Sequence, residues 1–245
     1  MKFTAKSDIG KKRANNEDDF YVRKINNDFY LYIVADGMGG YECGEVASSI
    51  ATSSISSFLE EKAQIINKAD TQSIKAILKE AVNFANSEIY NLEKTDEKYK
   101  GMGTTVVLVS KVNNEVYYLS VGDSRIYYID DNFEKIKQIT EDDTYVNTLV
   151  KTNVINEDEA LTHPQRHMLT KAIGVFKDVD FNVSTLRDKD GYLLLCTDGM
   201  TNMLSNEQIL DVFKNEKFDK IAEALVKKAN ENGGNDNITV VVVKL

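Results

Sequence analysis

The sequence predicts an α+β fold in which two antiparallel β-sheets pack face to face and helices cover their outer faces. Three observations support this fold class. The apolar segments follow the order strands, two helices, strands, an irregular segment, strands, a helix and a strand, unlike the regular alternation of a doubly wound fold. The links between neighbouring strands are too short for parallel crossovers. Two facing sheets with helices outside would bury all of the apolar runs.

The first third of the chain predicts a hairpin and a pair of helices. Apolar runs at 20–22 and 29–35 flank a polar turn at 26–28. Apolar residues follow helical spacing across 45–61, and a longer stripe with a period of about 3.6 residues covers 74–92. We expect these two helices to pack against each other and against a sheet.

The middle of the chain predicts consecutive strands joined by short polar turns. The β-rich segments are 105–110, 115–121, 124–129 and 135–139. Because the links are so short, we expect these four strands to form one antiparallel meander.

Residues 140–179 form an irregular insert, which contains an acidic cluster at 141–143, the only proline and both histidines. An insert of this length in a compact domain is usually functional or mobile. After it we expect strands at 180–186 and 192–197, a helix with an apolar face over 218–229, and a final apolar strand at 237–244. No proline- or serine-rich linker divides the chain, so residues 1–245 predict a single domain.

The composition restricts the class of protein. A net charge of −9 disfavours a nucleic-acid binder, which normally carries a basic face. Two cysteines indicate no disulfide framework. The N-terminus lacks the apolar core of a signal peptide, and no apolar run reaches the length of a membrane span. We therefore expect a cytoplasmic protein that binds neither nucleic acid nor membrane.

Two similar segments place an aspartate directly after a strand-like apolar run. YLYIVADGMGG (30–40) contains Asp36, and YLLLCTDGM (192–200) contains Asp198. Asp-Gly is also a strong hairpin-turn dipeptide, so either segment alone fits a simple turn. Because a buried carboxylate is costly without a partner, the matching pair favours one shared metal or phosphate site.

Several better-known motifs are excluded. The glycines after Asp36 do not complete a dinucleotide-binding fingerprint, because Glu42 occupies the position of its last glycine, and no P-loop occurs. Residues 188–191 do not match a calcium loop. His163 and His167 have the spacing of a zinc-binding helix face, but no third ligand accompanies them.

The remaining pattern is a set of carboxylates near predicted strand ends: Asp18, Asp36, Asp123, Asp198 and Asp236. Oxygen ligands without histidine or cysteine select hard cations such as Mg²⁺ or Mn²⁺. Two such ions can activate a water molecule and hold a phosphoryl group. The sequence therefore predicts a magnesium or manganese site.

Seven stretches in order along the chain resemble the metal-dependent serine/threonine protein phosphatases, the PPM or type 2C family, in its compact bacterial form. They are SDIGKKRANNEDD (7–19), VADGMGG (34–40), GMGTTVV (101–107), SVGDSRIY (120–127), HPQRHMLTKAIG (163–174), CTDGMTNML (196–204) and GGNDNITVVVV (233–243). The resemblance implies a central β-sandwich flanked by pairs of helices, with residues of about 140–179 forming a flap beside the metal ions.

The resemblance also implies a role for each site residue. Asp36 would bridge two Mn²⁺ or Mg²⁺ ions, and the Gly37 carbonyl would bind one of them. Asp198 and Asp236 would complete the ligands of the other ion. Glu17 would lie near the second ion, with Asp18 in support.

Two further residues match the family pattern. Asp123, with Asp198, would form a third, weaker metal site, and Arg13 would hold the substrate phosphate, which suits a guanidinium fork. Simpler interpretations remain for three residues. Glu17 and Asp123 also fit hydrogen-bonding turn residues, and Arg13 fits a surface charge beside Lys11 and Lys12.

The implied activity is hydrolysis of phosphoserine and phosphothreonine esters on proteins by a water molecule that two metal ions activate. The implied setting is a monomer that opposes a bacterial serine/threonine kinase. The sequence departs from the family pattern at Met38, where animal members carry a histidine proposed as general acid, so water would have to protonate the leaving oxygen. His167 and Lys171 replace an expected asparagine and arginine in the flap.

Three rival hypotheses are weaker. A phosphatase dedicated to one sporulation or stress regulator would usually carry additional regions, and the chain has no residues left over for them. A catalytically inactive binding protein on this scaffold would have lost carboxylates that are all present. A calcium module would need a standard loop.

Overall fold

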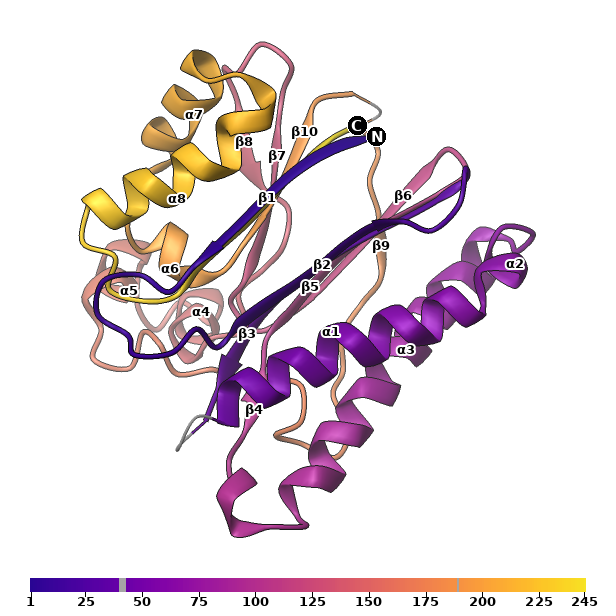
Figure 1. Cartoon of the computed structure of the whole chain (residues 1–245). Helices are drawn as coiled ribbons and strands as arrows, with labels where there is room; N and C mark the ends of the chain where they lie inside the picture. The colour runs from indigo at the N-terminus through magenta and orange to yellow at the C-terminus, as the bar shows by residue number, and fades with distance from the viewer. Residues whose placement is uncertain (40–42, 189) are drawn as a thin grey trace.

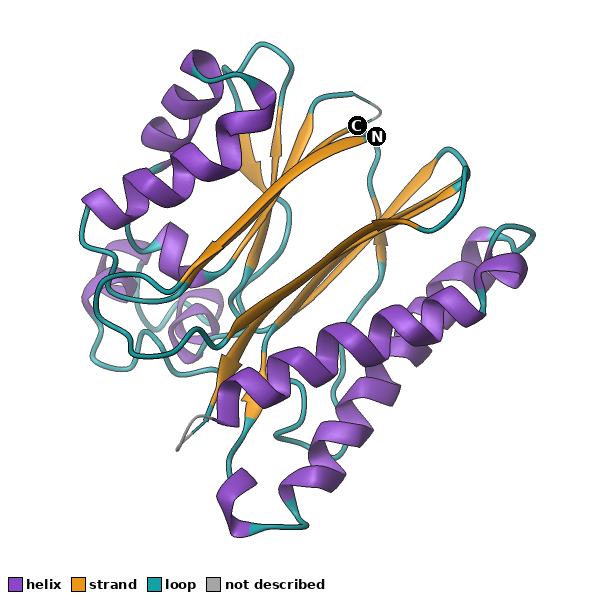
Figure 2. Ribbon diagram, viewed as in Figure 1, coloured by secondary structure: helices purple, strands orange, loops and turns teal. Residues whose placement is uncertain are grey.

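The computed structural model describes residues 1–39, 43–188 and 190–245. Two antiparallel sheets pack face to face, with helices on the outer face of each (Figure 1), and Figure 2 shows the resulting layers of helix, strand, strand and helix. The predicted fold class is confirmed. Within the described ranges, no helix combines the length and apolar character needed to cross a bilayer.

The first sheet joins the two ends of the chain. Its strands, in spatial order, are β1 (Lys2–Asp8), β11 (Ile238–Lys244), β10 (Tyr192–Cys196), β7 (Arg125–Ile129) and β8 (Ile136–Gln138). Every neighbouring pair in it is antiparallel. The central strand β11 is buried on both faces, which explains its nearly uninterrupted valine sequence.

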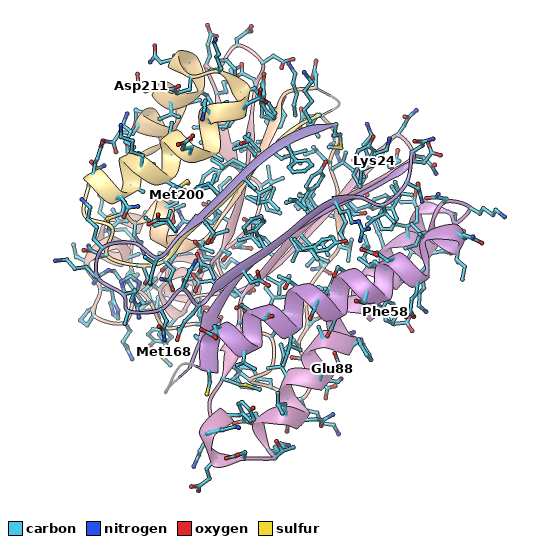
Figure 3. All side chains as sticks on the ribbon, viewed as in Figure 1. Lys24, Phe58, Glu88, Met168, Met200 and Asp211 are labelled. Atoms are coloured by element: carbon cyan, nitrogen blue, oxygen red, sulfur yellow. The ribbon has the colours of Figure 1, made fainter. Side chains whose placement is uncertain are left out.

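The second sheet contains most of the strands that the first half of the chain forms. Its strands are β2 (Asp18–Lys24), β3 (Phe29–Met38), β5 (Val106–Val112), β6 (Glu115–Val121) and β9 (Ser184–Thr185), with β4 (Gly103–Thr104) paired to the end of β3. Inward-facing residues of both sheets form the middle of the core, including Tyr32, Val107 and Val241. Side chains fill the space between the sheets (Figure 3).

Long helices cover both outer faces. Helices α1 (Cys43–Glu61) and α3 (Thr71–Glu93) pack on the second sheet, while α7 (Asn206–Asn215) and α8 (Ile221–Glu231) pack on the first. The shorter helices are α2 (Ala63–Ile66), η1 (Glu97–Tyr99), α4 (Tyr145–Lys151), α5 (Glu157–Thr162), α6 (Asp198–Thr201) and η2 (Phe218–Lys220). The predicted helices at 45–61 and 74–92 are confirmed, and the insert holds α4 and α5.

Strand β1 and helix α7 are among the elements that were not predicted from the sequence. Strand β1 lies at a sheet edge and is mostly exposed or half-buried, so its apolar pattern is weak. Helix α7 is marked by a capping box, in which Ser205 and Gln208 bond to each other's backbone, and this sequence signal was available. The strand expected at 180–186 is reduced to β9, because only two residues there pair with the end of β6.

The prediction of a four-stranded meander is wrong at its centre. Strands β5 and β6 form a hairpin in the second sheet, whereas β7 and β8 pair in the first. The chain crosses between the sheets at Gly122, whose φ of 100° suits glycine, and Asp123 lies in this crossover. The crossover brings Asp123 to the end of the sandwich where the other carboxylates lie.

Strand β3 does not end at Asp36, as its apolar run suggested. It continues to Met38, and Gly37 and Met38 pair with Thr104 and Gly103 of β4. A side chain at Gly37 would overlap the backbone of Gly44 at the start of α1, so the glycine permits the helix to begin against the strand. Gly40 and Glu42 lie outside the described residues.

Candidate active site

Five aspartates lie at one end of the sandwich. Asp18 begins β2 and is the direct pairing partner of Asp36 in β3. Asp123 lies in the β6–β7 crossover, Asp198 begins α6 just after β10, and Asp236 directly precedes β11. The two sheets therefore deliver carboxylates from separate parts of the sequence to one place.

The backbone of Asp36 is fixed by two threonines. Its N–H donates to Thr105 Oγ1 at 3.0 Å, and its carbonyl accepts from Thr105 N and from Thr104 Oγ1 at 2.9 Å. Thr105 Oγ1 also shares a hydrogen bond of 2.7 Å with Ser124 Oγ, next to Asp123. This network links the Asp36 strand to the crossover.

The carboxylates strongly affect one another. Burial, and then the negative charges of Asp18, Asp198 and the other two aspartates, raise the pKa of Asp36 well above its ordinary value. Burial first, and neighbouring aspartates second, raise the pKa values of Asp18 and Asp123 to about 7. The pKa of Asp198 is raised by burial and then by Asp236. Such a cluster is stabilised by protons or by cations.

Asp18 has an incomplete set of partners. Its Oδ2 accepts a hydrogen bond of 2.9 Å from Thr197 Oγ1, but its Oδ1 is buried without a partner. A buried carboxylate oxygen without a donor is costly, so this atom favours a cation nearby.

The donor chemistry fits a hard divalent cation. Carboxylate oxygens predominate, and the oxygen of Asp18 described above lacks a donor. Among the described residues, however, no three His, Cys, Asp or Glu side chains converge closely enough to hold one ion. The predicted ligands thus share one region but would have to draw together around an ion.

Arg13 lies at the mouth of this region. Its Nη2 donates to Asp236 Oδ2 at 2.8 Å, and about half of its side chain (52%) is exposed. The hydrogen bond to Asp236 raises the pKa of Arg13. The structure therefore pairs the predicted phosphate-binding residue with a predicted metal ligand, rather than leaving Arg13 as an isolated surface charge.

Glu17 combines structural contacts with a position near the site. Its N–H donates to Asn237 Oδ1 at 2.8 Å, and its carbonyl accepts from Gly37 N at 3.0 Å and from Ser48 Oγ at 2.7 Å. Its carboxylate lies against Gly44, where a Cβ would be only 2.6 Å from Glu17 Oε2. The turn interpretation thus describes the backbone of Glu17, while its carboxylate lies beside the start of α1.

Asn237 is a site residue that the sequence did not single out. Besides accepting from Glu17, it donates through Nδ2 to the carbonyls of Ile9 and Asn15 at 2.9 and 2.8 Å. It thereby fixes the loop that carries Arg13 to the segment that carries Asp236. Its only sequence signal was its place in the stretch 233–243.

The flap borders the same region. A pocket of about 1100 Å³ is lined by Arg13, Asp123, Asp198 and Asp236 together with residues of α4 and α5. Nδ1 of His167 lies 4.0 Å from Asp198 Oδ2. Lys171 forms an ion pair with Asp143 rather than with one of the five aspartates. Of the described residues, Asp18, Asp36 and Glu17 are outside this lining.

Comparison with known proteins gives consistent matches over the whole chain. The protein phosphatase 2C family model matches residues 9–241. Protein phosphatase PhpP of Streptococcus pneumoniae is 35% identical, over 100% of this chain and 98% of the relative. The solved structure of the S. agalactiae serine/threonine phosphatase is similar with a TM-score of 0.90 at 34% identity, over 98% of each chain.

A further solved structure bears on the metal site. It is the catalytic domain of the serine/threonine protein phosphatase PstP in complex with two manganese ions, with a TM-score of 0.82 at 32% identity. The match covers 98% of this chain and 96% of that one.

Proposed function

Because the chain belongs to the protein phosphatase 2C family, it is a metal-dependent serine/threonine protein phosphatase, and we propose that Asp36, Asp198 and Asp236 hold its metal ions. The observation that carries this assignment is that five aspartates from both sheets lie at one end of the sandwich, where burial and mutual repulsion raise the pKa values of Asp18, Asp36, Asp123 and Asp198. The two manganese ions in the PstP structure support a centre of two ions, Mn²⁺ or Mg²⁺.

The neighbouring groups complete the proposed centre. The Gly37 carbonyl would contribute an oxygen to one ion, and Glu17 and Asp18 would support the second. Asp123, which interacts with Asp198, would belong to a third and weaker site. When bound, divalent ions in such a centre activate water and neutralise the charge of the phosphoryl group.

Arg13 acts on the substrate. A partly exposed ion pair contributes little to stability, so Arg13 can leave Asp236 at small cost and turn to the phosphate. A guanidinium binds two phosphate oxygens at once and orients the ester for attack. This role agrees with the position of Arg13, which lines the pocket while about half of its side chain stays exposed.

The leaving oxygen requires a proton from water. Met38, in β3, carries no proton to donate. The arrangement therefore assigns orientation and charge stabilisation to the protein, and protonation to water.

The cellular setting follows from the family. We infer that the enzyme acts in the cytoplasm as a monomer with one catalytic domain, residues 1–245. Its substrates are phosphorylated proteins, and it reverses the action of a bacterial serine/threonine kinase.

The assignment is tested by turnover of a phosphothreonine peptide with Mn²⁺, and then with a chelator. Asp36→Asn should lose at least about a hundredfold in kcat, because removing a group that stabilises transition-state charge has an effect of this order. Asp28→Asn, in the exposed turn of the same hairpin, is the matched control and should keep full activity. Turnover without metal, or full activity in Asp36→Asn, contradicts the proposed centre.

A further inference from the structure

The loop between β1 and β2, residues 9–17, carries Arg13 at its exposed tip. Residues 11–14 are all exposed, so packing of their side chains does little to hold the tip in place. A guanidinium on a loosely held loop must be ordered each time it binds a ligand, and this ordering reduces affinity. The phosphate role of Arg13 therefore depends on the contacts that fix the loop at its ends.

Asp8, the last residue of β1, ties the start of this loop to helix α8. Its Oδ1 accepts a hydrogen bond of 2.9 Å from Gly10 N, two residues further along, which closes a turn at the start of the loop. The same oxygen accepts a second hydrogen bond of 2.9 Å from Nδ2 of Asn230, in the last turn of α8. Both bonds are partly buried. We call this pair of hydrogen bonds to Asp8 the loop anchor.

Asn230 also supports the segment that carries Asp236. Its carbonyl accepts a hydrogen bond from Gly233 N at 3.1 Å. Its Oδ1 lies against Gly234, where a Cβ would be only 2.4 Å away. One residue at the end of α8 thus contacts both the loop that carries Arg13 and the segment that leads into β11.

The loop and this segment are also joined backbone to backbone. Lys11 N donates to the carbonyl of Gly234 at 2.7 Å, and Figure 1 shows the β1–β2 loop running beside the segment between α8 and β11. Gly10 has a φ of 79°, and a Cβ there would be 2.1 Å from the carbonyl oxygen of Asp236. The turn that the loop anchor closes therefore lies directly against the backbone of Asp236, and a shift of this turn would move Arg13.

The loop anchor is independent of the ion pair between Arg13 and Asp236. Arg13 must leave Asp236 to bind the phosphate, and it then loses this side-chain contact. The bonds to Asp8 involve neither of these side chains, so they persist when the ion pair opens. Neither Asp8 nor Asn230 is among the described residues that line the pocket, so any effect of theirs on phosphate binding must pass through the loop.

We propose that Asp8 and Asn230 are positioning residues for substrate binding, which hold Arg13 beside the reaction site through the loop anchor. The inference rests on the proposed function, because it requires Arg13 to bind the phosphate. The anchor needs from Asp8 an oxygen that accepts two hydrogen bonds. Asp8→Asn keeps such an oxygen, whereas Asp8→Ala removes it.

The first measurement is KM and kcat for a phosphothreonine peptide with Mn²⁺ present. Asp8→Ala should raise KM by about fivefold, the order expected when one more side chain must be ordered on binding, and should change kcat less. Asp8→Asn should return KM to near the wild-type value.

Asp130→Ala is the matched control for this measurement. Asp130 Oδ1 also accepts two backbone hydrogen bonds, from Glu134 N and Lys135 N at 2.9 and 2.8 Å. Its turn follows β7, at the end of that strand away from Asp123. Asp130→Ala should therefore leave KM unchanged.

The second measurement separates positioning from general stability. In the Arg13→Ala background, Asp8→Ala should raise KM no further, because the guanidinium that Asp8 positions is absent. Asn230→Ala removes the helix side of the anchor and leaves the turn at Gly10 in place. It should raise KM in the same direction, with the same lack of additivity, and it carries the test if Asp8→Ala does not fold.

The possible failures are distinguishable. If Arg13→Ala raises KM while Asp8→Ala and Asn230→Ala leave it unchanged, the anchor is overturned and the role of Arg13 stands. Effects that add to that of Arg13→Ala, or a KM for Asp8→Asn as high as that for Asp8→Ala, would also overturn the anchor. An unchanged KM in Arg13→Ala contradicts the phosphate contact, and the anchor with it. A wild type without Mn²⁺-dependent turnover contradicts the metal centre.

Discussion

At the scale of single residues, the pairing of Arg13 with Asp236 links substrate binding to the metal site. Arg13→Ala should raise KM for a phosphothreonine peptide by about tenfold, because a hydrogen bond to a charged group contributes about 1.5–3 kcal/mol. Lys12→Ala removes a neighbouring exposed charge and is the control. An unchanged KM in Arg13→Ala would contradict the assigned contact with phosphate.

Asn237 permits a second prediction at this scale. Asn237→Ala should lower the free energy of unfolding by about 3 kcal/mol, because it removes three partly buried hydrogen bonds to backbone groups of Ile9, Asn15 and Glu17. Asn215→Ala, an exposed amide on α7, should change the urea midpoint little. Equal midpoints for the two variants would show that the Asn237 contacts are not structurally important.

The residues differ in how far their roles follow from sequence. Asp36 and Asp198 were predicted because each follows a buried run, and a carboxylate there needs a partner. Asn237 and Thr105 act through hydrogen bonds to backbone groups that are far away in the sequence, and no local sequence pattern predicts such contacts. The partners in the Arg13–Asp236 pair are far apart in the sequence, and they meet only because β1 pairs with β11.

At the scale of elements, β3 is the strand that positions Asp36. Before Asp36 this strand pairs with β5, and after Asp36 it pairs with β4. Gly37→Ala should destabilise the protein and reduce activity, since its methyl group would overlap the backbone of Gly44. Gly39→Ala is a milder control, because the nearest backbone atom would be at 3.3 Å. Thermal unfolding of both variants is the measurement, and an unshifted Tm for Gly37→Ala would contradict the predicted overlap.

The crossover after β6 shows where element prediction from sequence fails. Short links and alternating residues predict that neighbouring strands pair, and this is correct for β5 with β6 and for β7 with β8. A three-residue link also permits a change of sheet, which depends on where the inward faces pack. Strand content was therefore predictable, whereas assignment to a sheet was not.

At the scale of the whole molecule, the order of apolar segments was sufficient for the fold class. Buried runs such as that of β11 leave few alternatives to a sandwich covered by helices. Each sheet combines strands that are far apart in the sequence, such as β1 with β11 in the first sheet and β6 with β9 in the second. The carboxylates therefore come together only in the complete fold.

The carboxylate cluster should make the stability of the whole metal-free protein depend on pH. Asp18 and Asp123 have pKa values raised to about 7 in the fold, so the native state holds protons that the unfolded chain releases above about pH 4. Because the native state then binds more protons than the unfolded state, the free energy of unfolding should fall as pH rises from about 4 to about 7. Mn²⁺ should reverse this fall, since bound cations replace the protons.

Urea unfolding at about pH 5 and pH 8, in chelator and in Mn²⁺, measures this dependence. Without metal, the midpoint should be lower at the higher pH, and Asp18→Asn should reduce the difference by removing one of the titrating groups. With Mn²⁺ the two midpoints should approach each other. A metal-free protein that becomes more stable toward pH 8 would show that its aspartates are already ionised and compensated in the fold, and that cation binding does not complete the site.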